Sequence, residues 1–113
     1  MKFTDTHEWI LVKEGVGTVG VTNYAQKELG DIVYVELPKV GAYIKKGEAG
    51  AVLESTKAAA DVYSPVSGKI VEVNTRLTSQ PELINSSPER EGWLFKLVVS
   101  DTQEFDNLSD KEI

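Results

Sequence analysis

Residues 52–68 read VLESTKAAADVYSPVSG, and this stretch decides the fold. Valines stand five residues before and five residues after Lys57, and the side chains around the lysine are small. Glycines at positions 47 and 68 bound the segment on either side. Two apolar runs that converge on a short stretch without bulky groups are typical of a β-hairpin. The pattern predicts a hairpin over about residues 49–68, with a lysine at its tip.

The rest of the chain is also rich in short β-branched runs separated by glycine and proline. The predicted strands cover residues 9–13, 18–21, 32–37, 42–44, 49–54, 60–63, 69–73 and 93–99. Short helices are expected near residues 23–29, as one turn within the polar connection 74–90, and in residues 101–113. Thr22 and Asn23 can cap the first helix, and Gly30 is placed to end it. Many short strands with turns between them indicate a mostly β sandwich or barrel, here a single domain over residues 1–113.

Composition excludes several classes of function. The chain has 113 residues, a net charge of −6, one histidine and no cysteine. Disulfides, thiolate metal sites, cysteine nucleophiles and multi-histidine zinc sites are therefore excluded. An acidic chain is repelled by phosphate backbones, so we expect no nucleic-acid partner. No apolar run reaches the ~20 residues of a membrane span, and the first residues lack the apolar region of a signal peptide. We expect a cytoplasmic protein with no membrane partner.

Three weaker motifs have simpler explanations. Residues 15–20 match GxGxxG, but β-branched residues follow the glycines where a nucleotide-binding turn needs a helix, so a hairpin turn is the better interpretation. The His7-Glu8-Trp9 triplet lacks a second histidine for zinc, which favours the start of a strand with a core tryptophan. Period-2 placement puts the carboxylates of Glu54, Asp61 and Glu72 on solvent faces by default. No serine has a histidine dedicated to it, so a nucleophilic triad has no support.

The lysine at the predicted hairpin tip has two interpretations. Exposed lysines are common, and most of them are only solvated. The small residues beside Lys57 leave its amine unshielded, however, and this suits a side chain that enters another enzyme's active site. The residues alone leave a solvated lysine and an acylated carrier lysine both open.

The hairpin segment and several other stretches of the chain are similar to those of one known family. Residues 52–68 closely resemble the lipoyl-attachment segment of the glycine cleavage system H protein family. Further stretches agree with that family in order and spacing, and they are residues 7–9, 20–26, 29–38, 71–74, 85–88 and 92–93. The resemblance therefore covers nearly the whole chain. It implies a barrel-sandwich hybrid, as in lipoyl and biotinyl domains, with lipoate joined through an amide to Lys57. Biotin carriers place methionines beside the lysine, whereas Thr56 and Ala58 stand here, which favours lipoate.

The resemblance also implies a function and its residues. Members of this family are carriers, not enzymes. They take the aminomethyl group of glycine from the P protein, a glycine decarboxylase, to the T protein, an aminomethyltransferase. The L protein, a dihydrolipoamide dehydrogenase, then reoxidises the arm. A lipoate ligase or lipoyl transferase would read Glu54 when it modifies Lys57. Thr6, Glu8 and Asp61 match the cleft that receives the amine end of the arm.

Departures from the family pattern keep alternatives open. Glu89 stands where the family usually has tyrosine, and the C-terminal segment is shortened to residues 108–113. These changes bear on partner docking more than on lipoylation. A second hypothesis is a lipoyl relay or storage protein for another lipoate-dependent pathway. A third is an unmodified interaction domain in which Lys57 is incidental. Nothing in the pattern requires a self-complementary interface, so a monomer is expected.

Overall fold

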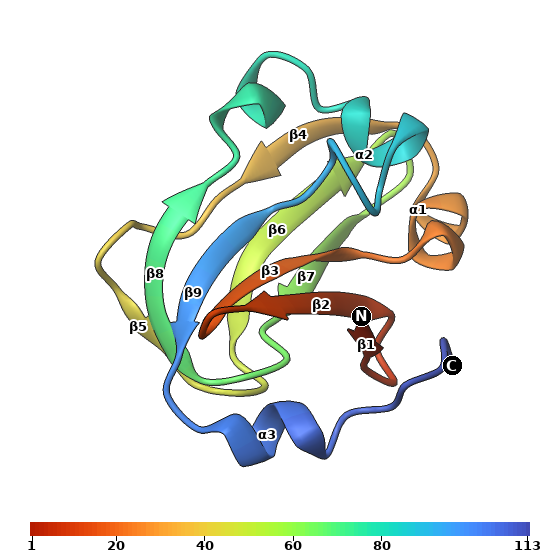
Figure 1. Ribbon diagram of the computed structural model, residues 1–113. Coiled ribbons are helices and arrows are strands. Elements are labelled where there is room, and N and C mark those ends of the chain that lie inside the picture. Colours follow the sequence, from red (N-terminus) through yellow and green to blue (C-terminus); the bar gives the residue numbers. More distant parts are fainter.

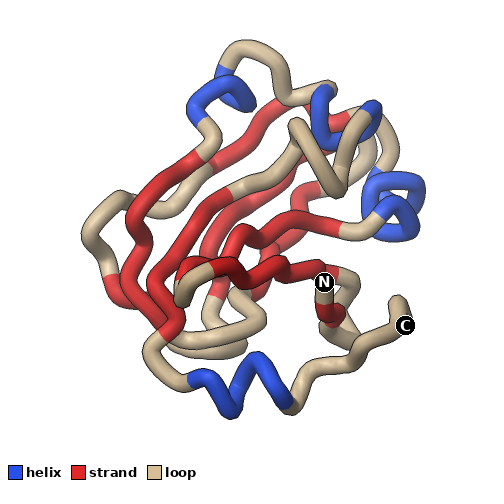
Figure 2. The backbone as a smooth tube through the Cα atoms, in the orientation of Figure 1, coloured by secondary structure: helices blue, strands red, loops and turns tan.

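Nine β-strands form two antiparallel sheets in the computed structural model, which describes residues 1–113 (Figure 1). The larger sheet has the order β1 (Lys2–Phe3), β2 (Glu8–Lys13), β3 (Val16–Val21), β9 (Phe95–Val99), β8 (Gly68–Val73) and β5 (Tyr43–Ile44). The smaller sheet has the order β4 (Ile32–Glu36), β6 (Ala49–Ser55) and β7 (Ala59–Tyr63). The helices are α1 (Asn23–Leu29), the 3₁₀ helix η1 (Thr75–Thr78), α2 (Leu83–Ser86) and α3 (Thr102–Asp106). Strands clearly outnumber helices along the chain, as Figure 2 shows.

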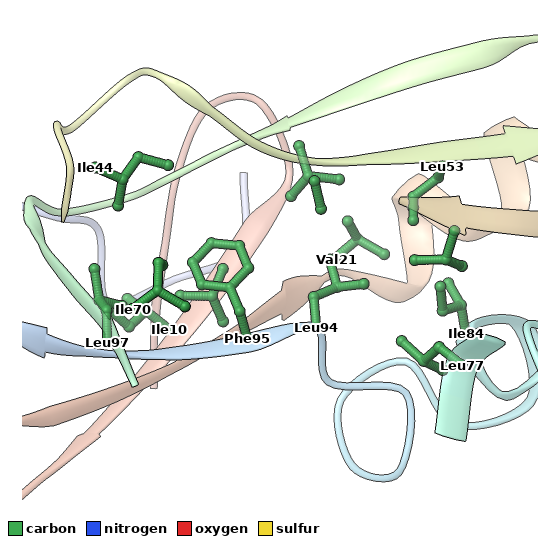
Figure 3. Close-up of a cluster of buried hydrophobic side chains, with 14 of the residues drawn as sticks. Ile10, Val21, Ile44, Leu53, Ile70, Leu77, Ile84, Leu94, Phe95 and Leu97 are labelled. Carbon is green, nitrogen blue, oxygen red and sulfur yellow. The ribbon is translucent and has the colours of Figure 1, made fainter. Parts of the chain in front are cut away.

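The core lies between the two sheets. Its largest fully buried side chains include Ile10 and Phe95 from the larger sheet and Leu53 from the smaller one. Leu77 and Ile84, in the two short helices of the 74–94 connection, close one end of this core (Figure 3). The alternation of buried and exposed residues along the strands places the apolar side chains inward. The expected mostly β, barrel-sandwich fold is confirmed, and the strands form two separate sheets rather than a closed barrel.

The GxGxxG stretch lies in the β2–β3 hairpin, as the sequence predicted. Gly15 occupies the turn in the left-handed region, with φ +79°. Gly20 lies opposite Trp9 in the ladder, and a Cβ at Gly20 would come within 2.6 Å of the indole ring. Gly15 therefore allows the turn, and Gly20 leaves room for the buried ring of Trp9. The Trp9 indole nitrogen donates a hydrogen bond to the Pro88 carbonyl at 3.0 Å.

Helix α1 begins and ends as its capping residues predict. The Thr22 hydroxyl accepts a hydrogen bond from the Ala25 amide at 3.2 Å, and Gly30 ends the helix with a φ of 85°. Asn23 is the first helical residue rather than a second cap. Along the sequence, the helix connects β3 of the larger sheet with β4 of the smaller sheet.

Two segments differ from the sequence-based expectation in detail. The 74–90 connection holds two short helices rather than one turn, and each of them buries one apolar side chain. The last strand begins at Phe95 instead of residue 93, and the Trp93 carbonyl accepts a hydrogen bond from the Asn74 side-chain amide at 2.8 Å. Strand β1, which pairs with β2 through Lys2 and Phe3, was not predicted.

The C-terminal segment holds a short helix, as expected, but α3 covers only Thr102–Asp106 of the expected range 101–113. Phe105 and Leu108, three residues apart, both pack against the core. The Glu104 carboxylate accepts hydrogen bonds from the Ser67 amide at 2.7 Å and the Ser67 hydroxyl at 3.0 Å. No helix in the chain is both long enough and apolar enough to span a membrane.

Candidate functional site

Lys57 lies in the turn that joins β6 to β7. Ser55 organises this turn, because its hydroxyl oxygen accepts hydrogen bonds from the amides of Lys57 at 3.1 Å and Ala58 at 3.0 Å. The Ser55 amide also donates to the Ala58 carbonyl at 2.8 Å. The backbone of the turn is therefore tied within the turn itself, while the neighbouring side chains stay small. Figure 1 places this turn at the same end of the molecule as α1 and α2.

The lysine side chain is exposed and has no charged partner. None of the three ion pairs in the protein involves Lys57, and no hydrogen bond reaches its Nζ. Its stem lies against Gly30, where an added Cβ would sit 3.0 Å from the lysine Cε. An amine that is exposed and unpaired is available for acylation, so the residue fits the attachment of a prosthetic group through an amide.

A cleft of about 190 Å³ lies between α1 and the hairpin. Thr6, Glu8 and Asp61, the three residues that the resemblance implied for an amine-binding cleft, all line it. Its other lining residues are His7, Val21, Tyr24, Ala25, Glu28, Leu29, Leu53, Ala60 and Val62. The fold thus brings together carboxylates from the N-terminal segment and from the second strand of the hairpin, above an apolar floor.

Glu8 is the most buried polar group of the cleft, with 2% of its surface exposed. One carboxylate oxygen accepts hydrogen bonds from the hydroxyls of Thr4 and Thr6, at 2.5 Å each. The other accepts from the Tyr63 amide at 3.2 Å. Burial raises the pKa of Glu8, and the three hydrogen bonds oppose that rise. The buried Glu8 carboxylate has no positively charged partner within the protein. A cation bound in the cleft would therefore supply the counter-charge.

Comparison with known proteins shows which family the chain belongs to. The family model described as glycine cleavage H-protein matches residues 1–113. The chain belongs to the glycine cleavage H-protein family. Glycine cleavage system H protein of Thermotoga maritima is 60% identical over 98% of this chain and 90% of its own length. Probable glycine cleavage system H protein of Aeropyrum pernix is 56% identical over 96% of this chain and 76% of its own length. The crystal structure of a glycine cleavage system H protein from Mycobacterium marinum matches with a TM-score of 0.83 at 39% identity, covering 88% of this chain and 83% of that one.

Two of the predicted site residues in this H-protein family member lie on the exposed hairpin. Asp61 is on β7 opposite Val52, at the rim of the cleft. Glu54 is on β6, three residues before the lysine, and it does not line the cleft. Both side chains are exposed, as their period-2 placement predicted. The two carboxylates therefore differ in position: Asp61 borders the cleft, and Glu54 is exposed on the hairpin outside it.

Sequence reasoning missed His7 and Glu28, which also line the cleft. His7 has a left-handed backbone with φ 70°, and its ring centroid lies 4.5 Å from that of Tyr24. Its buried Nδ1 has no hydrogen-bond partner. The charge of Glu28, one turn after Tyr24 on α1, raises the pKa of the tyrosine. The signal in the sequence is the position of His7 next to Glu8, although a lone histidine makes a poor metal site. No cluster of metal-ligating residues occurs in the chain.

Other features of the surface lie apart from this site. A larger groove of about 490 Å³ lies between β4, β5 and β6, and it contains none of the predicted site residues. Glu89, the departure from the H-protein family pattern, lines a separate hollow with Asn23 and Arg90. Position 89 therefore lies outside the lining of the cleft.

Proposed function

We propose that this chain is the lipoyl carrier of a glycine cleavage system, with lipoate joined through an amide to Lys57. One observation carries the proposal. In a chain of this family, an exposed and unpaired lysine stands at the tip of a tight hairpin beside a carboxylate-lined cleft. When bound, the lipoyl group supplies a disulfide that can accept and release a one-carbon amine and a pair of electrons.

The cleft residues would hold the amine end of the arm. A protonated amine is attracted to Glu8 and Asp61, and the attraction is stronger near Glu8 because burial lowers the local dielectric. The Thr6 hydroxyl, which donates to Glu8, would share in binding the same group. The apolar floor, which includes Val21 and Leu53, would keep water from the labile end of the arm.

The exposed hairpin would be the part that other proteins meet. We propose that a lipoate ligase or lipoyl transferase reads Glu54 while it modifies Lys57, and that the whole chain, residues 1–113, acts as one carrier domain. Its partners would then be the P, T and L proteins of the system. Because the lipoyl arm is tethered to the carrier, its end meets a bound partner enzyme at an effective concentration on the order of mM, as for a short flexible link. No feature of the tip or the cleft favours the relay or storage alternative.

Mass analysis of the protein from its native host tests the proposal. Intact mass and peptide mapping should find one lipoyl group, on Lys57. An unmodified Lys57 in a host that lipoylates its other proteins would contradict the proposal. To test the system as well as the modification, the lipoylated chain is mixed with P protein, glycine, T protein and tetrahydrofolate, which accepts the one-carbon group. Glycine-dependent ammonia release should then require this chain.

A further inference from the structure

Asn85 lies in α2, more than fifty residues from α1 in the sequence, yet it binds the end of that helix. Its Nδ2 donates to the Gly30 carbonyl and to the Gln26 side-chain oxygen, at 2.9 Å each. Its Oδ1 accepts from the Ile32 amide, also at 2.9 Å. One amide side chain thus satisfies the backbone on both sides of Asp31, where α1 has ended and β4 is about to begin.

The segment that Asn85 holds is the segment against which the hairpin tip rests. The Asp31 carbonyl accepts a hydrogen bond from the Thr56 amide at 3.1 Å, next to the lysine. The stem of the Lys57 side chain lies on Gly30, which has no Cβ and whose φ is +85°. Of the turn's backbone hydrogen bonds, the one from Thr56 is the bond that anchors the tip to the rest of the molecule.

We infer that Asn85 is a positioning residue for the carrier lysine. It fixes residues 30–32, those residues fix the tip through Thr56 and Gly30, and the tip presents Lys57 to the lipoylating enzyme. Without Asn85 the Gly30 carbonyl and the Ile32 amide lose their partners, and a buried polar group without a partner favours local rearrangement. The inference rests on the proposed function for its enzymatic consequence. The order of the tip can be measured without that function.

The chain offers a matched control for the test, Asn74. Its Nδ2 also donates to two acceptors, the carbonyls of Glu91 and Trp93 at 2.8 Å each. Asn85→Asp and Asn74→Asp therefore make the same change. Each replaces the side-chain NH₂ donor with a carboxylate oxygen, which then faces the oxygen atoms that accepted the hydrogen bonds. Both variants should lose stability, but only the first alters the support of the tip.

Two readouts are taken on the full, unlipoylated chain at a temperature where all variants are folded. The first is hydrogen exchange of the Thr56 amide by NMR, which should be about tenfold faster in N85D and unchanged in N74D. The second is steady-state lipoylation by a lipoate ligase with lipoate and ATP. For N85D we expect kcat/KM to fall about tenfold, with kcat lowered because the amine is presented in the wrong geometry. N74D should keep the wild-type kcat.

The outcomes separate the inference from the proposed function. If the wild-type chain is lipoylated and N85D matches N74D in both readouts, the inference is wrong and the carrier function stands. If the wild-type chain is not lipoylated, the carrier function fails, and Thr56 exchange alone decides whether Asn85 orders the tip. If N85D does not fold, Gln26→Leu replaces it. That variant removes one partner of Asn85 from the surface of α1, and it should shift both readouts in the same direction by a smaller factor.

Discussion

Lys57 and Glu8 lie at the two ends of the proposed carrier cycle, and the protein treats them in opposite ways. The lysine is exposed, has no partner and stands on a turn that is tied to itself. The glutamate is 2% exposed and accepts three hydrogen bonds from the protein. A group that other enzymes must modify has to be accessible. A group that binds a labile amine has to be held in place by hydrogen bonds and shielded from water. The comparison predicts that substitutions at the two sites affect different steps.

The largest effect is expected at the exposed end. Lys57→Arg keeps the charge but offers no amine to acylate, so lipoylation should be abolished. Stability should change by less than about 0.5 kcal/mol, because the side chain is exposed and unpaired. Intact mass after incubation with a lipoate ligase measures lipoylation, and urea denaturation measures stability. Lys27→Arg, an exposed lysine on α1, is the control and should be lipoylated normally. Lipoylation that persists in K57R would show that another lysine carries the group.

A smaller effect on a different step is expected at the buried end. Glu8→Gln keeps the shape but removes the buried charge, so the carried amine should be lost about tenfold faster. The measurement is ammonia release from the loaded chain in the absence of T protein. Lipoylation itself should stay unchanged, because the cleft takes no part in presenting the lysine. Glu36→Gln, an exposed change outside the cleft, serves as the control. An unaltered release rate in E8Q would remove Glu8 from the proposed binding role.

Asp61 tests how much burial of a carboxylate contributes to the binding of the amine in the cleft. Its carboxylate is exposed at the rim, where solvent and salt screen the charge. Asp61→Asn should therefore hasten ammonia release only roughly two- to threefold, as expected for a surface charge pair. Raising the salt concentration should reduce the difference between wild type and D61N more than that between wild type and E8Q. A D61N effect as large as that of E8Q would mean that the rim, not the buried group, holds the amine.

The smallest effect concerns stability and pH in the empty protein. The pKa of Glu8 is raised above 4.5 in the folded chain, mainly by burial, so protonation favours folding. This stabilising contribution is complete below the unfolded pKa and is lost as pH rises through the folded pKa. Urea denaturation of wild type and E8Q from pH 4 to pH 7 should show wild type losing stability relative to the variant. A constant difference over that range would contradict the raised pKa.

The local elements could be predicted from the sequence because their signals are local. The valines around Lys57 indicated the hairpin, and Thr22 with Gly30 marked both ends of α1. Strand β1 was missed, and the two short helices of the 74–94 connection were merged into one turn. Their positions depend on tertiary partners, such as Ser109 for Phe3 and the core for Ile84.

The site could be predicted only in part. Period-2 placement correctly put Glu54 and Asp61 on exposed faces, but no pattern in the sequence joins Asp61 to Glu8, which are fifty-three residues apart. Their meeting in one cleft was expected from the resemblance alone. For Asn85, the sequence gives no hint of its partners, because Gly30 and Ile32 lie at another turn of the chain. Contacts between distant segments are decided by packing, and residue type alone does not reveal them.

The pairing of the two chain ends has a consequence for engineering. Phe3 and Ser109 exchange backbone hydrogen bonds, from the Phe3 amide at 2.8 Å and from the Ser109 amide at 3.2 Å. Figure 1 shows both termini on one side of the molecule, away from the β6–β7 turn. Domains whose ends meet in this way tolerate circular permutation and insertion into a host loop. The chain could thus be grafted as a cassette into a scaffold of choice, with its lysine pointing outward.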